Sequence, residues 1–173
     1  MVISVGSVMH VVLGACVLAL AEVSQLHGGD AALRGLPGVA VVAESTSGDV
    51  RRYGLDEDWL AGRVRAALER AGVPLLERGD ALATERQPLL VVRFQTVRVP
   101  DAPIVAWHLS LAMHQRVASL GADSTRTLAQ TWAAGASLGV TAARLLRASV
   151  AKTLGSQVEE FVRAWKGTGA SGP

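Results

Sequence analysis

The polar and apolar positions divide this chain into two unequal parts. The first 21 residues, Met1 to Ala21, contain no Asp, Glu, Lys or Arg, and all 17 basic and 15 acidic side chains lie between Glu22 and Lys166. A helix of about 20 apolar residues spans a hydrocarbon core of roughly 30 Å. The pattern predicts that residues 2–21 face a membrane and that the rest forms a water-exposed domain.

The periodicity of the second part predicts an α+β fold. Alternation predicts strands over residues 38–45, 73–78, 89–99, 104–118 and 125–136. Helical spacing predicts helices over residues 56–71 and from about 141 to 165. The order is a transmembrane helix and then β-α-β-β-β-β-α, a mostly antiparallel sheet with two helices on one face. Residues 22–37 are the expected linker, 38–166 the expected domain, and 167–173 a flexible tail.

The first helix of the domain carries the clearest local signals. Leu60, Val64 and Leu68 recur every four residues and predict its buried stripe. Three acidic residues from Asp56 complement the helix dipole at its first turn. Gly72 predicts a left-handed C-terminal cap.

The strand over residues 104–118 predicts two faces of different character. Its apolar set is Trp107, Leu109, Leu111 and Met113, and its other set is His108, Ser110, Ala112 and His114. Such alternation is typical of an antiparallel strand with one face in the core and the other exposed to water or to a partner. We therefore take His108, Ser110, His114 and Arg116 as interface candidates.

Trp59 is a further interface candidate. It lies about 100° from the Leu60 stripe, and exposed tryptophan is enriched at protein interfaces and bilayer boundaries. None of these residues forms a catalytic, cofactor-binding or metal-binding set. His108 and His114 stand about 20 Å apart on a strand, so they cannot share one ion.

Other polar segments have plain structural explanations. The acidic side chains of residues 56–58 point in different directions, which argues for helix capping rather than a metal cluster. Residues 45–49 lack a nucleophile elbow, and the glycine-rich residues 135–139 lack a phosphate-loop lysine. The net charge is only +2, and one Tyr and two Phe give little stacking surface, so we expect no nucleic-acid partner. We expect no enzyme activity and no cofactor.

The first segment has three possible fates. It is retained as a signal anchor, cleaved after the Ala19-Leu20-Ala21 site, or cleaved before Cys16 and lipidated there. Flanking charge and export both favour a bacterial inner-membrane protein with the C-terminal domain in the periplasm. The single cysteine excludes an intrachain disulfide.

The pattern that begins Gly54-Leu55 and continues through Leu60, Val64, Leu68 and Ala71-Gly72-Val73 resembles a broad group of uncharacterised exported bacterial proteins. The similarity continues at Leu90, Val92 and Phe94, at Thr131-Trp132 and Gly135, and in the final helix. These proteins resemble small α+β modules of periplasmic auxiliary lipoproteins in transport, assembly and secretion systems. The resemblance implies a binding or assembly part without catalytic residues.

Two functions follow as expectations. The first is a non-catalytic, membrane-anchored accessory subunit that binds other protein subunits of a membrane complex for transport, assembly or energy transduction. The second is a free or lipidated periplasmic module that binds a lipid, peptide or glycan. A hydrolase is a remote third, because the sequence supplies no polar cluster for one.

Overall fold

The computed structural model describes residues 29–45, 50–83, 87–98, 100, 102–118 and 125–169. It is an α+β fold with a mixed sheet of five strands. The strands are β1 (Ala40–Ser45), β2 (Leu89–Arg98), β3 (Ile104–Ala118), β4 (Arg126–Ala133) and β5 (Ser137–Ala142). The helices are α2 (Glu57–Ala71), α3 (Arg78–Ala83) and α4 (Leu146–Gly167), with short 3-10 turns η1 (Asp30–Leu33), η2 (Val50–Tyr53) and η3 (Ala143–Leu145). The expected α+β class is confirmed.

The 15-residue strand β3 is the central element of the sheet. It pairs with β2 along one edge and with β4 and then β5 along the other, all antiparallel. Strand β1 pairs with β2 in parallel, with Ala40 beside Leu89. The helix α2 connects these two parallel strands, as a parallel pair requires a crossover.

The residues at both ends of α2 cap the helix as the sequence predicts. The Asp56 carboxylate accepts a hydrogen bond from the Trp59 backbone N–H at 2.8 Å, so Asp56 is the N-cap. Gly72 ends the helix with φ at +75°, a conformation that glycine adopts without strain. Leu60, Val64 and Leu68 are fully buried.

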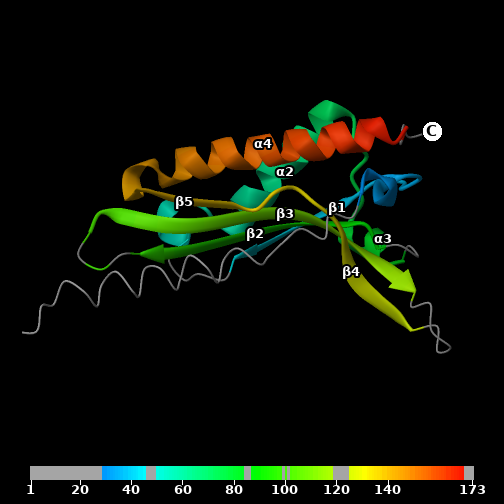
Figure 1. Cartoon of the computed structure of the whole chain (residues 1–173), viewed down its shortest axis with the longest axis horizontal. Coiled ribbons are helices and arrows are strands. Elements are labelled where there is room, and N and C mark those ends of the chain that lie inside the picture. The colour runs from blue at the N-terminus through cyan, green and yellow to red at the C-terminus, as the bar shows by residue number, and fades with distance from the viewer. Residues whose placement is uncertain are drawn as a thin grey trace, which may run out of the picture.

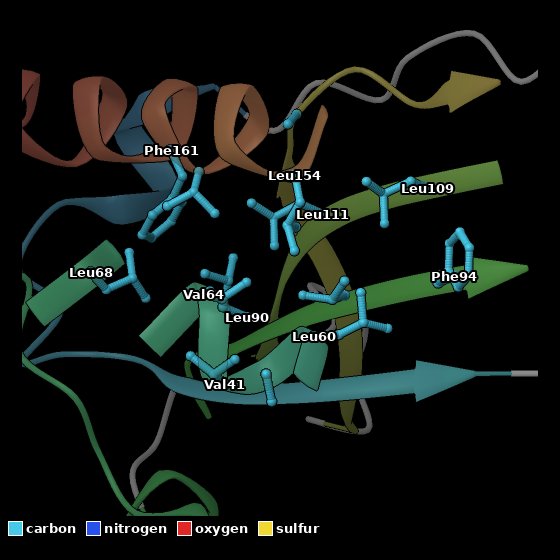
Figure 2. Close-up of a cluster of buried hydrophobic side chains, with 14 of the residues drawn as sticks. Val41, Leu60, Val64, Leu68, Leu90, Phe94, Leu109, Leu111, Leu154 and Phe161 are labelled. Carbon is cyan, nitrogen blue, oxygen red and sulfur yellow. The ribbon is translucent and has the colours of Figure 1, made fainter. Parts of the chain in front are cut away.

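The helices α2 and α4 lie on the same face of the sheet and enclose the main core (Figure 1). Figure 2 shows Leu60 and Val64 of α2 and Leu154 and Phe161 of α4 in the same core cluster as Leu111 of β3, with Leu154 beside Leu111. The Phe161 ring meets the Trp132 ring edge to face, with centroids 5.1 Å apart. The residues just before β1 also contribute, because Leu33 and Leu36 are buried in this core.

Three predicted boundaries are wrong. Residues 73–78 form only one parallel bridge, between Val39 and Leu75, because Pro74 cannot donate to a ladder. The helix α3 replaces the rest of that segment and part of the expected loop. The expected strand over 125–136 is divided into β4 and β5, and α4 begins at Leu146 rather than near Thr141. The β-branched Val140 and Thr141 belong to β5.

Among the described elements, α3 covers the opposite face of the sheet, and it covers one end of that face. The helix α3 places Ala81 against Ala40, Leu89 and Val91, which form a second, smaller core. No helix within the described ranges is long and apolar enough to cross a membrane. The expected membrane segment, residues 2–21, and the lipidation candidate Cys16 lie outside the described residues.

Candidate functional site

The second sheet face is the side of the sheet opposite α2 and α4. Its rows follow the strand register: Arg93 lies beside Ser110, Gln95 beside His108, and Val97 beside Ala106. On the other edge of β3, His108 lies beside Leu138 and Ala106 beside Val140. At this end the face is therefore built from β2, β3 and β5. The assignment of His108, Ser110, His114 and Arg116 to the face opposite Leu109 and Leu111 agrees with this register.

Basic side chains outnumber acidic ones on this face. At their second-face positions the strands β2, β3, β4 and β5 carry no Asp or Glu, whereas they carry Arg93, Arg116 and Arg126 together with two histidines. Glu44 of β1 is the acidic residue of the sheet, and it accepts a 2.7 Å hydrogen bond from Arg93. Both side chains of that pair are about half exposed (47%), so it contributes only about 0–1 kcal/mol to stability.

The end of the face away from α3 is apolar and exposed. Val97, Leu138 and Val140 are 69%, 64% and 68% exposed. They surround a shallow depression of about 440 Å³, which is also lined by Gln95, Ala106, Trp107, His108 and Gly139. Large side chains that stand so far out of the surface together mark a contact surface for another molecule.

Trp107 also lines this depression, although its indole lies on the core side of the sheet. A side chain at Gly139 would collide with the Trp107 ring, so the glycine leaves room for the indole across the strand pair. Trp107 is only 8% exposed, and its Nε1 has no hydrogen-bond partner among the described residues. The sequence assigns Trp107 to the core, and the structure agrees.

His114 stands at the other end of the face, beside Leu89. Burial lowers the pKa of His114 below its ordinary value of 6.5, and Arg93 lowers it further; a backbone hydrogen bond at Ala112 and the Glu44 carboxylate oppose both effects. Its Nδ1 is buried and has no partner among the described atoms. The neutral imidazole is therefore the form that the folded protein favours.

The lowered pKa of His114 predicts a pH-dependent stability. The unfolded chain takes up a proton near pH 6.5 and the folded chain only at lower pH, so the free energy of unfolding should fall as the pH drops below 6.5. His114→Leu should remove this part of the pH dependence, and Arg93→Gln should reduce it less, because burial is the larger cause. Denaturant melts at about pH 7.5 and about pH 5 test this. An unchanged pH dependence in His114→Leu would contradict it.

The other interface candidates already have partners in the fold. Arg116 is exposed, and its Nε donates to the Gln87 side chain at 3.1 Å. Trp59 lies on α2, away from the second sheet face, and is partly buried. The guanidinium carbons of Arg63 and Arg147 lie 5.2 and 5.1 Å from the Trp59 ring centroid, which is cation–π distance. The structure therefore does not bring Trp59 together with the residues of β3.

Sequence analysis missed Gln157, a buried polar residue on α4. Its side-chain Nε2 donates to the carbonyl oxygens of Gly135 at 2.8 Å and Leu109 at 3.3 Å, at the break between β4 and β5. Beside it runs a polar groove of about 610 Å³. Gly135, Ala136 and Ser137 form one wall, and α4 supplies Ser149, Lys152, Thr153, Ser156, Gln157, Glu160 and Arg163.

The described residues place no three His, Cys, Asp or Glu side chains where they could hold one metal ion. The helix-capping interpretation of Asp56 is confirmed by its bond to Trp59. Ser45, the first residue of the serine-rich segment, donates its backbone N–H to Glu57 at 3.2 Å. The glycine-rich stretch at 135–139 forms the break between β4 and β5 and the start of β5.

Comparison with known proteins adds no assignment to this geometry. No family model matches the chain, and no curated protein matches it.

Proposed function

We propose that this protein is a non-catalytic, membrane-anchored accessory subunit whose folded domain docks on a larger membrane protein complex. Residues 2–21 tether the chain to the bacterial inner membrane, and the domain lies in the periplasm. The host is a transport, assembly or energy-transducing complex. The main support is the exposed apolar end of the second sheet face, where Val97, Leu138 and Val140 are each about two-thirds exposed.

The chemistry of this face suits a protein surface. Its centre is apolar, and its margin carries the Arg93–Glu44 pair, His108 and Ser110. An apolar centre with a polar rim is the usual anatomy of a protein interface. The face is also rigid, because β3 is paired along both edges and packed beneath two helices.

Ser110→Arg tests the proposed docking. The arginine adds a long cation beside Arg93, so it should separate the domain from its partners without unfolding it. We expect the wild-type chain, extracted from membranes in mild detergent, to migrate with other subunits and the variant to migrate alone. Ala148→Arg is the control, because it adds the same charge at an exposed position of α4. Migration of the wild-type chain as an isolated monomer would refute the proposal.

One observation favours the second function, a free or lipidated module that binds a lipid, peptide or glycan. The depression beside Val97 and Leu138 has a volume of about 440 Å³, within the usual range of small-molecule sites. The two functions differ in the fate of the first segment. The intact mass of the mature protein distinguishes them, because only the anchored form keeps residues 1–21.

A further inference from the structure

The two outer edges of the sheet differ in how far neighbouring groups cover their backbone. At β1, Arg65 of α2 donates to the Val41 carbonyl at 3.1 Å, and Glu57 of α2 accepts from the Ser45 N–H at 3.2 Å. Val39, just before the strand, exchanges hydrogen bonds with Pro74 and Leu76. Side chains of α2 and a neighbouring segment therefore cover part of this edge, at the Val41 carbonyl, the Ser45 N–H and the backbone of Val39. Such partial cover hinders another strand from adding to an edge.

The edge at β5 has no such cover from the described residues. The Ala134 N–H donates to the Leu111 carbonyl, so the odd-numbered residues of β3 direct their backbone groups toward this edge. The residues of β5 that pair with them are Ser137, Gly139 and Thr141, and these direct their own N–H and C=O groups toward β3. Leu138, Val140 and Ala142 consequently direct their N–H and C=O groups outward, where no described strand pairs with them.

The sequence of β5 also lacks the usual defences of an edge. Ser137–Ala142 contains no charged residue and no proline, and the strand directs Leu138 and Val140 into solvent on the second sheet face. On the helix side, the polar groove runs between the start of β5 and α4. An added strand would thus find free backbone groups, apolar neighbours on one side and polar neighbours on the other.

We infer that the outer edge of β5 accepts an extended segment of a partner protein as an additional strand. This inference rests on the proposed function, and it names the docking mode. Because side chains alternate along a strand, the segment should alternate in character. Its apolar residues lie beside Leu138 and Val140. Its other residues enter the groove, where Lys152 and Arg163 outnumber Glu160 and favour acidic side chains.

The test uses a fluorescent, end-capped peptide of about eight residues in which valine alternates with glutamate, a typical strand length. Anisotropy titration of the full chain in mild detergent should show saturable binding. Val140→Pro should weaken binding at least about tenfold, because proline removes an N–H that only an added strand uses. Val140→Ala keeps that N–H and should stay within about threefold of wild type. Unfolding midpoints show whether both variants fold.

A second peptide, N-methylated at every residue so that neither of its edges can donate a backbone N–H, tests the same idea on the unmodified protein. N-methylation blocks main-chain pairing, so this peptide should not bind. The inference fails if it binds as well as the first, if Val140→Pro binds like wild type, or if neither peptide binds. It also fails if Val140→Pro only converts a dimer to a monomer, since the edge would then pair with a second copy. Co-migration with other subunits despite such a failure would leave the proposed function standing.

Discussion

Leu111→Ala should lower the free energy of unfolding by about 2–5 kcal/mol, the range for large-to-small changes in a core. Leu111 is fully buried beneath the helices, where Figure 2 shows it beside Leu154. Truncation leaves a cavity between β3 and α4 that neighbours on two regular elements cannot close. Urea denaturation of the full chain in mild detergent measures the effect.

Ser110→Ala is the matched control for Leu111→Ala. Ser110 is the adjacent residue of β3, points to the second sheet face and is only partly buried. Its substitution should cost well under about 1 kcal/mol. Equal destabilisation by the two changes would mean that the register of β3 is wrong, and the proposed docking face would be wrong with it.

Gln157→Leu should lower the free energy of unfolding by about 1–3 kcal/mol, although leucine is apolar and of similar size. The substitution removes the donor that serves the Gly135 and Leu109 carbonyls at the strand break. Buried acceptors without a donor keep the full cost of their lost hydration. Ser156→Ala, one residue earlier on the exposed side of α4, should change stability by less than about 0.5 kcal/mol.

Thermal and urea melts of both variants test this expectation. A Gln157→Leu protein as stable as wild type would show that water or a shifted backbone satisfies the two carbonyls. Amide exchange adds local information: the β4–β5 junction should exchange faster in Gln157→Leu, while the amides of α2 should not.

The elements that sequence predicts well are those with local signals. The cap at Asp56, the stripe from Leu60 to Leu68 and the stop at Gly72 fix α2 without tertiary information. The alternation of β3 likewise separates Leu109 and Leu111 from Ser110. In both elements the periodicity and the burial agree, because each has one face in the core and the other near water.

The elements that sequence misplaces depend on contacts between distant segments. The local signal for the break between β4 and β5 is weak: Gly135 lies among alanines, and a glycine within a strand pattern does not by itself distinguish a break from a bulge. The break is held by Gln157, some 22 residues later. On a helical pattern Gln157 resembles a surface residue at the margin of the Leu154 stripe, so its buried role emerges only when α4 lies across the sheet.

The candidate surface was predictable in part for the same reason. The strand register fixes the side of the sheet on which His108 and Ser110 lie. It does not predict that Val97 and Val140, from strands far apart in sequence, stand on either side of Ala106. Nor does the spacing of Trp59 predict that Arg147, from another helix, covers its ring.

The covered edge of β1 has a consequence for how the chain folds. Ala40 and its partner Leu89 are 49 positions apart, so the ribosome releases β1 well before the strand that completes it. An apolar strand that waits for a distant neighbour is exposed to aggregation. The helix α2 is made in the interval, and its Arg65 and Glu57 bind the edge that β1 would otherwise present. We therefore expect α2 to protect β1 during synthesis, before β2 is available to pair with it.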